Sequence, residues 1–357
     1  MIKPRIGVVG GGVFGSNILR AFYFAQQKGL IELVALADLN EEVLKKHNKA
    51  YGVKGYTDYI KMFDEAELDG VAVVTPDYLH KKVVLEAARR HIHVLCEKPL
   101  DTTVEGGQEM IDACRANNVM LYVDFHKRLD PGHMLARQDI RNGRIGEVLY
   151  GYACMEDKIV VPSQWFKSWV HNSSPVWFLG VHFYDLICWM IGQKPVSCYA
   201  TGTKKKLASM GLDTYDAIQA QIKFESGATF TMDASWVLPE SFTTIVNQEI
   251  RVVGTDGIIE IDSEDRGMLS ASAFEPAATV NTPFSSMVFK HPIYGEKPQG
   301  YVYESMLYFT ELLSMLKNGQ TLQDLEGMYC NGEEALMATR IAQAVHRSVE
   351  SGQVEYI

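Results

Sequence analysis

A glycine-rich turn near the N-terminus has the composition and spacing of a phosphate-binding site. Residues 10–15, Gly-Gly-Gly-Val-Phe-Gly, follow a short apolar run and precede residues 16–27, which have the apolar spacing of a helix. A second apolar run ends at Asp38, about 20 positions further on. Strand, glycine turn, helix, strand and acidic residue occur in this order in dinucleotide-binding βαβ units. The predicted cofactor contacts here are Gly10, Gly12, Val13, Phe14, Gly15 and Asp38.

Each glycine of the turn has its own physical task. Gly10 permits the tight bend, Gly12 lets the backbone approach a pyrophosphate, and Gly15 lets helix and strand pack closely. The helix N-terminus adds unpaired N–H groups and a positive dipole end. Asp38 is expected to bind the ribose hydroxyls and to repel a 2′-phosphate, and no arginine follows it directly. NAD is therefore favoured over NADP, and a glycine turn without a ligand is the alternative.

Two further groups of polar residues follow predicted strands. Strand and helix signals alternate up to about residue 123, which predicts a doubly wound parallel sheet with helices on both faces. Ligands of such sheets bind beyond the carboxyl ends of the strands. Thr75-Pro76-Asp77, with His80 nearby, follows one strand, and Glu97-Lys98-Pro99 follows the next. Lys98 is expected beside the nicotinamide half of the cofactor, although a surface lysine before a turn proline would have the same sequence.

Together these motifs resemble the glucose–fructose oxidoreductase, inositol dehydrogenase and rhizopine-catabolism (Gfo/Idh/MocA) family. The resemblance covers nearly the whole chain, and Glu-Lys-Pro at residues 97–99 is its most specific part. The other matching segments are residues 10–15, 38, 74–80, 94–100, 128–131, 143–148, 180–182 and 185. The resemblance implies an NAD-binding Rossmann domain followed by a substrate domain. It places Thr75, Pro76, Asp77, His80, Glu97 and Lys98 near the cofactor.

Oxidation of a secondary alcohol needs a base for the hydroxyl proton while nicotinamide C4 takes the hydride. The resemblance implies that Lys98 and His182 are the catalytic residues and that they converge on one cavity from different domains. A Lys98 cation would lower the pKa of His182, which favours the neutral imidazole that accepts a proton. Without the resemblance, a histidine on an apolar helix is more often a core residue.

One position departs from the family pattern. Many dehydrogenases of the family have an aspartate four residues before this histidine, and here that residue is Phe178. Because residues i and i+4 of a helix share a face, Phe178 is expected one turn before His182. Asp185 lies on the same helix and could replace the aspartate in part, or it could form a hydrogen bond within its domain.

Aromatic and polar residues flank the predicted histidine helix. His126 and Arg128 follow the last Rossmann strand, and Trp165, Lys167 and Trp169 precede the helix. Indole rings stack on the apolar face of a sugar, while polar side chains pair with its hydroxyls. These five residues and the two helix residues above are the candidate substrate contacts. The tryptophans could equally be core or interface residues.

After about residue 124 the apolar pattern changes to a period of two. Residues 218–224 and 229–236 alternate apolar and polar side chains, which is typical of half-buried antiparallel strands. The predicted second domain is α+β, with a large open, mainly antiparallel sheet. Together with the predicted parallel sheet of the first domain, this places the whole chain in the α/β class. The resemblance implies a homodimer or homotetramer through the polar face of this sheet, and a solvated face is the alternative. The polar face includes Gln219, Gln221, Thr229 and Thr231.

Length and composition limit the remaining possibilities. A chain of 357 residues favours two domains, expected at residues 1–124 and 125–357, with C-terminal helices that can pack back on the first. The net charge of −10 disfavours nucleic acid and anionic membranes as partners. Six cysteines without C-x-x-C spacing disfavour a metal cluster or disulfide framework, so reduced thiols in the cytoplasm are expected. The longest apolar stretch, residues 176–191, is too short and too polar to span a bilayer.

The leading interpretation is an NAD-dependent oxidoreductase. It would transfer a hydride between nicotinamide and a secondary alcohol or ketone of a sugar, sugar derivative or cyclitol. An NAD-dependent glycosidase that uses transient oxidation is one alternative, because some members of the family have that activity. A non-catalytic dinucleotide-binding regulator is another, and Phe178 keeps it open although Lys98 and His182 are both present.

Overall fold

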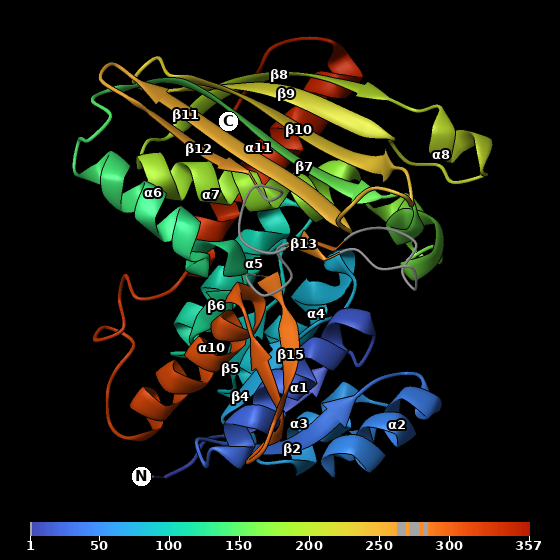
Figure 1. Ribbon diagram of the computed structural model, residues 1–357. Helices are drawn as coiled ribbons and strands as arrows, with labels where there is room; N and C mark the ends of the chain where they lie inside the picture. Colours follow the sequence, from blue (N-terminus) through green and yellow to red (C-terminus); the bar gives the residue numbers. More distant parts are fainter. Residues whose placement is uncertain (1, 263–268, 271–278, 281–284) are drawn as a thin grey trace. The chain divides into compact units, whose positions relative to one another are not determined.

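Two compact units make up the computed structural model (Figure 1). The described residues are 2–262, 269–270, 279–280 and 285–357. The first unit comprises Met1–His126 and Ser286–Leu336, and the second comprises Lys127–Ser285 and Met337–Ile357. Each unit is thus assembled from two separate stretches of chain. The sequence analysis placed residues 286–336 in the second domain, while expecting C-terminal helices to pack on the first.

Six parallel strands form the sheet of the first unit, in the order β3-β2-β1-β4-β5-β6. The strand order changes direction between β1 and β4, as in a doubly wound Rossmann fold, so the predicted fold of this region is confirmed. Because helices cover both faces, β1, β4 and β5 are almost wholly buried. The strands are β1 (Arg5–Val9), β2 (Glu32–Ala37), β3 (Lys54–Tyr56), β4 (Gly70–Val73), β5 (His93–Cys96) and β6 (Leu121–Val123).

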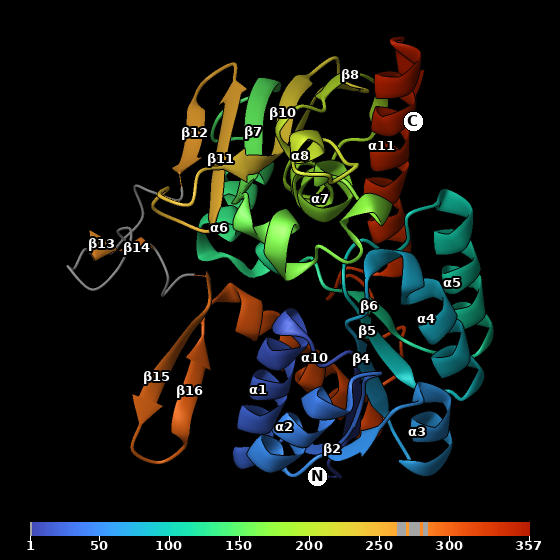
Figure 2. The ribbon, with the colours of Figure 1, turned by 90° about the vertical axis from the view of Figure 1, so that its right-hand side faces the viewer.

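Helices lie on both faces of this sheet (Figure 2): α1 packs with α10 on one face, and α4 packs with α5 on the other. Phe22 of α1 and Phe309 of α10 have ring centroids 6.3 Å apart. Between them the helices bury both surfaces of a sheet whose central strands are mostly apolar. The helices are α1 (Val13–Gln27), α2 (Glu41–Tyr51), α3 (Tyr59–Glu65), α4 (His80–Arg89), α5 (Val104–Ala116) and α10 (Tyr301–Lys317), with a 3₁₀ turn η1 (Asp77–Leu79) before α4.

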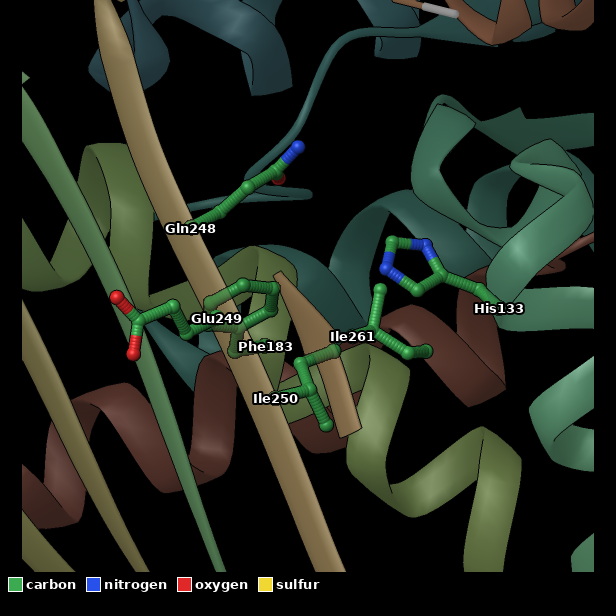
Figure 3. A pocket seen from close by; sticks show the side chains of 6 residues that line it. All are labelled: His133, Phe183, Gln248, Glu249, Ile250 and Ile261. Atoms are coloured by element: carbon green, nitrogen blue, oxygen red, sulfur yellow. The ribbon is translucent and has the colours of Figure 1, made fainter. Parts of the chain in front are cut away.

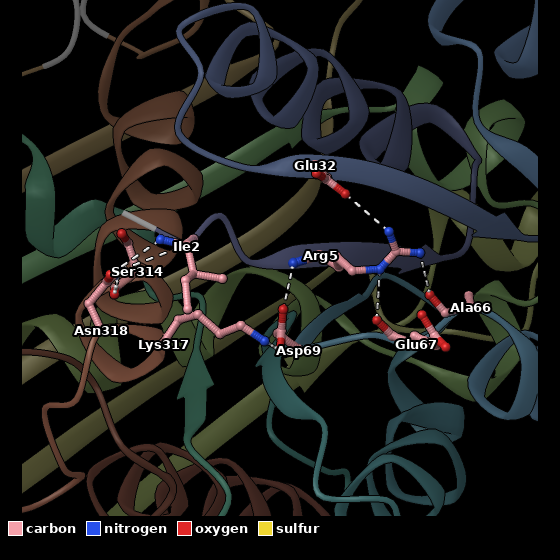
Figure 4. Close-up of polar contacts among 9 residues, drawn as sticks. All are labelled: Ile2, Arg5, Glu32, Ala66, Glu67, Asp69, Ser314, Lys317 and Asn318. Atoms are coloured by element: carbon pink, nitrogen blue, oxygen red, sulfur yellow. Dashed lines mark hydrogen bonds and ion pairs between the residues drawn. The ribbon is translucent and has the colours of Figure 1, made fainter.

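Arg5 fixes the first strand at the amino edge of this sheet (Figure 4). Its guanidinium donates to Glu32 Oε2 at 3.0 Å and to two backbone carbonyl oxygens after α3, each also at 3.0 Å. Its backbone N–H donates to Asp69 Oδ2 at 2.8 Å, and Lys317 Nζ donates to the other oxygen of that carboxylate. The end of α10 is thereby tied to the start of β1 and β4, opposite the carboxyl ends of the strands.

Seven strands form the sheet of the second unit, in the order β12-β11-β7-β10-β9-β8-β17. Neighbouring strands are antiparallel except β7 and β10, which run parallel. The predicted mainly antiparallel sheet is confirmed, and this parallel pair makes it a mixed sheet. The strands are β7 (Val148–Lys158), β8 (Pro195–Thr203), β9 (Ala217–Phe224), β10 (Thr229–Leu238), β11 (Val246–Gly254), β12 (Ile258–Asp262) and β17 (Glu355–Tyr356).

The residues with a period of two divide between the two faces of this second sheet. Ile218, Ala220, Ile222 and Phe224 are buried, together with Phe230, Met232, Ala234 and Trp236. The helix α7 (Val181–Ile191) packs with α6 (Pro131–Arg141) and contacts β7 on the buried face. On the opposite face, Gln219 and Gln221 are exposed, and Thr229 and Thr231 are half-buried.

The helix α7 starts later than its apolar pattern predicts. The sequence indicates a helix over 178–191, but residues Val176–Gly180 form a π turn, η5, and α7 begins at Val181. In η5 the Val181 N–H donates to the carbonyl oxygen of Val176, five residues earlier. Within the described part of the chain, no helix combines the length and apolar character needed to cross a membrane.

Shorter elements complete the described chain. In the first unit, β15 and β16 form a hairpin whose strand β16 contacts α1 and α10. Four short turns, η2 to η5, lie between β6 and α7 in the sequence. The remaining elements are η2 (His126–Leu129), η3 (Val161–Trp165), η4 (Val170–Asn172), α8 (Lys206–Ser209), β13 (Leu269–Ser270), β14 (Thr279–Val280), β15 (Met287–His291), β16 (Gly295–Gln299) and α11 (Gly332–Ser351).

Candidate active site

The glycine turn requires glycine at two of its positions. Gly10 has a φ of +99°, and a Cβ added to it would lie 2.4 Å from the carbonyl oxygen of Val74. A Cβ on Gly15 would lie 2.1 Å from the carbonyl oxygen of Gly10. Gly10 therefore lets the chain bend against the end of β4, and Gly15 lets α1 approach the turn.

The same turn leaves room for a ligand at Gly12. A Cβ on Gly12 would meet no atom within 4 Å, and no side chain caps α1 at this residue. The helix starts at Val13, so the second half of the motif is already helical and its first N–H groups face outward from the turn. An uncapped helix start beside an open glycine fits the pyrophosphate of a dinucleotide.

Asp38, at the end of β2, is bound to the glycine turn. Its Oδ2 accepts from the Gly11 N–H at 2.7 Å, and its Oδ1 accepts from the Asn40 N–H at 2.8 Å. The buried His47 supports the turn from α2, with its Nε2 2.9 Å from the carbonyl oxygen of Gly11. Sequence reasoning missed His47, because a histidine inside an amphipathic helix carries no local signal of this contact.

His80 joins the loops that follow β4 and β5. Its Nε2 lies 2.9 Å from the carbonyl oxygen of Thr75, and its Nδ1 lies 2.8 Å from that of Pro99. Burial lowers the pKa of His80 despite these two acceptors and the nearby Asp77. Both ring nitrogens thus contact protein carbonyls, so His80 positions the loop containing the half-buried Lys98. Asp77 is itself buried at the start of η1.

Glu97 belongs to a buried polar cluster at the ends of β5 and β6. It follows β5, while Asp124 follows β6, and both side chains are buried. Burial, and next the charge of Asp124, raise the pKa of Glu97 well above its usual value. Asp124 accepts from Ser305 of α10, and its Oδ2 lies 3.6 Å from His126 Nδ1. The sequence analysis placed Glu97 beside the cofactor but gave Asp124 and Ser305 no role.

His126 lies between two aromatic rings of the first unit. Its ring centroid is 6.1 Å from that of Phe14, on the glycine turn, and 5.7 Å from that of Tyr301, with interplanar angles of 26° and 20°. The predicted cofactor residue Phe14 and the predicted substrate residue His126 are therefore neighbours. Val13, next to Phe14, is exposed.

In the second unit, His182 occupies the first turn of α7 and is buried. Phe178 lies in η5, within an aromatic cluster formed with Phe166, Trp169 and Trp236. Its ring centroid is 4.7 Å from that of Phe166 and 6.1 Å from that of Trp236. Because η5 is a π turn, the spacing from Phe178 to His182 is not one regular helical turn. A charged side chain in this cluster would lose these ring contacts.

Asp185 forms a bidentate ion pair with Arg128. Arg128 Nε and Nη2 donate to the two carboxylate oxygens at 2.8 and 2.6 Å. The side chains are 12% and 2% exposed, respectively. The sequence analysis considered two roles for Asp185: partial replacement of the missing aspartate, or a hydrogen bond within its own domain. The observed ion pair corresponds to the second role. It also holds η2 against α7.

The aromatic segment before α7 has both packed and exposed members. Trp169 stacks on Phe166 with centroids 4.6 Å apart, whereas Trp165 is 48% exposed and Lys167 is exposed. The Trp169 ring therefore has a packing role. Trp165 and Lys167 lie on the surface of the second unit.

A small hollow in the second unit is lined by Phe183, the residue after His182, but by none of the candidate residues themselves (Figure 3). Its empty volume of about 140 Å³ is below the range of ligand pockets. Among the described residues, no group of three His, Cys, Asp or Glu side chains is arranged to hold a metal ion. The hollow is lined by His133, Phe183, Gln248, Glu249, Ile250 and Ile261.

Comparisons with known proteins agree with the fold of both units. Residues 4–125 match an oxidoreductase family profile with an NAD-binding Rossmann fold (GFO_IDH_MocA), and residues 133–260 match the GFO/IDH/MocA C-terminal domain. The rhizopine catabolism protein MocA of Rhizobium meliloti is 30% identical over 230 residues, which cover 64% of this chain and 70% of that protein.

Two solved structures share the fold over nearly the whole chain. Myo-inositol 2-dehydrogenase from Lactobacillus plantarum superposes with a TM-score of 0.80 at 20% identity, covering 100% of both chains. Scyllo-inositol dehydrogenase from Lactobacillus casei, with bound NAD(H) and scyllo-inositol, gives a TM-score of 0.78 at 18% identity and covers 99% of both chains.

Proposed function

Because this chain belongs to the Gfo/Idh/MocA family of oxidoreductases, we propose that it is an NAD-dependent dehydrogenase, or ketoreductase, of a sugar, sugar derivative or cyclitol. The observation that carries the proposal is a lysine, Lys98, placed after β5 in the unit that contains the glycine turn. A dinucleotide on that turn extends along the carboxyl ends of the strands, which is where Lys98 lies.

The proposed chemistry divides between cofactor and protein. NAD, when bound, supplies the hydride acceptor at its nicotinamide ring. We propose that Lys98 and His182 act on the substrate, one taking the hydroxyl proton and the other stabilising the developing alkoxide. His182 is buried in the first turn of α7, which would hold its imidazole in a fixed position. Asp185, bound to Arg128, would position α7 and hence His182.

A polyol fits the side chains available in the second unit. The proteins similar to this chain include inositol dehydrogenases and a levoglucosan dehydrogenase. The exposed Trp165 offers a ring for an apolar sugar face, and Lys167 offers a donor for hydroxyls. Phe178 and Trp169 would add an apolar surface. These side chains favour a ring with one apolar face over a small acid.

Cofactor choice, assembly and location form the finer part of the proposal. Asp38, at the ribose end of the turn, favours NAD over NADP, since a carboxylate repels a 2′-phosphate. The polar sheet face of Gln219 and Gln221 is the proposed contact of a homodimer or homotetramer. Five of the six cysteines are buried and none of the six forms a disulfide, which suits the cytoplasm, where thiols stay reduced.

A panel of sugars and cyclitols with NAD, followed at the NADH absorbance, tests the activity. Steady NADH formation from at least one polyol is expected, and Lys98→Ala should abolish most of it. Hydrolysis of a glycoside without net NADH formation would point to the glycosidase alternative. Tight NAD binding with no reaction on any polyol or ketone would instead support the regulator, an alternative that Phe178 keeps open.

A further inference from the structure

Glu97 and Asp124 bring two carboxyl groups together inside the first unit. The strands β5 and β6 are parallel neighbours, with Cys96 paired with Val123, so the residues after them meet at one edge. The Asp124 N–H donates to the carbonyl oxygen of Cys96 at 2.8 Å. Glu97 is 6% exposed and Asp124 is 0% exposed. Water therefore cannot screen the two acids from each other.

The surroundings of the two acids shift their pKa values in opposite directions. The Glu97 carboxyl forms hydrogen bonds with the Asp124 side chain and with the Lys98 backbone N–H. Burial tends to raise the pKa of Asp124, but the neighbouring His126, Glu97 and Ser305 outweigh it and lower that pKa. For Glu97, burial and the Asp124 charge both raise the pKa. A raised pKa on one acid and a lowered pKa on the other are what two acids that hold one proton between them would have.

Several other titratable groups lie near Glu97 and Asp124. On the β5 side, the neighbours are Cys96, Lys98 and Asp101. The Asp101 carboxylate accepts from the backbone and side chain of Thr103, which caps α5. On the β6 side is His126. From α10, Ser305 donates to Asp124, and the hydroxyls of Tyr122 and Ser305 lie 2.7 Å apart.

We propose that Glu97 and Asp124 share one proton and act as a positioning pair for Lys98. Glu97 donates its proton to Asp124, and its other carboxyl oxygen accepts the Lys98 backbone N–H. At the far end, Asp124 holds the His126 ring between Phe14 and Tyr301. Neither acid touches substrate in this proposal. Its effect on turnover rests on the proposed function, whereas the shared proton does not.

The shared proton would set the charge beside Lys98. With both acids ionised, two negative charges would favour the ammonium form of the lysine. With one proton bound, a single charge remains, located mainly on Asp124 and stabilised by His126 and Ser305. A lysine that must take a proton from an alcohol works better with the smaller negative charge beside it.

Carboxyl and amide NMR tests the pair without substrate. In full-length protein labelled with ¹³C at Glu carboxyls and ¹⁵N at Lys, we expect the Glu97 carboxyl to titrate well above the ordinary value of about 4.3. Glu97→Gln identifies its signal by removing it. The Lys98 amide, identified by its loss in Lys98→Arg, should shift with the same midpoint.

Asp124→Asn should move both midpoints to lower pH, because it removes the neighbouring negative charge. Asp69→Asn makes the same chemical change at the opposite edge of the sheet, where the carboxylate binds Arg5 and Lys317, and should leave both midpoints unchanged. A Glu97 signal that titrates near the ordinary value overturns the shared proton. A Lys98 amide that ignores the Glu97 titration overturns the positioning role.

Kinetics then separates this inference from the proposed function. In an active enzyme, Asp124→Asn should lower kcat about 10- to 100-fold with little change in KM for NAD, and shift the acid limb of its pH profile. Glu97→Gln should retain more turnover than Glu97→Ala, since an amide still donates to Asp124. Equal losses in the two Glu97 variants contradict the inference. A wild-type protein inert on all polyols contradicts the proposed function alone, because the NMR results stand without it.

Discussion

The proposed reaction depends on a few single side chains, and substitution of Lys98 tests it most directly. Lys98→Ala should lower turnover about 10²- to 10⁴-fold, the usual contribution of a positioned acid–base group, and leave NAD affinity nearly unchanged. Steady-state rates and calorimetric titration with NAD provide the two measurements. Lys82→Ala, on the exposed side of α4, is a matched control that should keep full turnover. Normal turnover in Lys98→Ala would remove Lys98 from the site.

Asp38 should decide between the two dinucleotides. We expect NAD to bind at least about tenfold more tightly than NADP, about 1.4 kcal/mol, because the carboxylate accepts ribose hydroxyls and repels a phosphate. Asp38→Ala should narrow this ratio by removing both effects, as calorimetry can measure. Asp58→Ala removes another aspartate of the same unit, the N-cap of α3, and should leave the ratio intact. Equal binding of both dinucleotides to the wild type contradicts this prediction.

The sequence predicts those parts of the site that depend on local geometry. The glycine turn is predictable because φ of Gly10 and the approach of Gly15 to it restrict residue type within six positions. The contact between Asp124 and Ser305 joins residues 181 positions apart, and no spacing rule links them. The contact between His47 and Gly11 could not be predicted for the same reason. Protonation of Glu97 depends on such distant partners, so it could not be predicted.

At the scale of elements, the pair of Arg128 and Asp185 joins η2 to α7. Asp185→Asn should lower the free energy of unfolding by about 3–5 kcal/mol, because it leaves a buried guanidinium without its counter-charge. Denaturant unfolding measures this loss. The double variant Arg128→Met/Asp185→Leu should lose less, since no unpaired charge stays buried. A stable Asp185→Asn protein with abolished turnover would show instead that Asp185 acts in catalysis.

Periodicity predicts elements better than it predicts their partners or their exact turns. The alternation in β9 and β10 identifies both strands and their buried faces. It does not reveal that β10 runs parallel to β7, because alternation is the same in either direction. The apolar spacing before His182 likewise indicates a helix but not η5. A π turn and an α turn differ in hydrogen bonding, which apolar spacing alone does not encode.

For the whole molecule, the second sheet predicts assembly. Light scattering at micromolar concentration should give two or four times the mass of one chain. Gln221→Arg should reduce that mass, because it places a charge in the centre of the polar face. Gln320→Arg makes the same change at an exposed position of the first unit and should not. A monomeric wild-type protein would show that this face is simply solvated.

The divided first unit has a consequence for synthesis on the ribosome. Its sheet is complete once residue 123 has been made, but α10 is translated only after nearly the whole second unit. Until then Phe22 and Tyr122 lack the Phe309 ring that packs near both. The nascent chain therefore carries an uncovered apolar surface for much of its translation. Premature termination before α10 would leave that surface permanently open, which makes truncated products of this chain natural targets for chaperones and proteases.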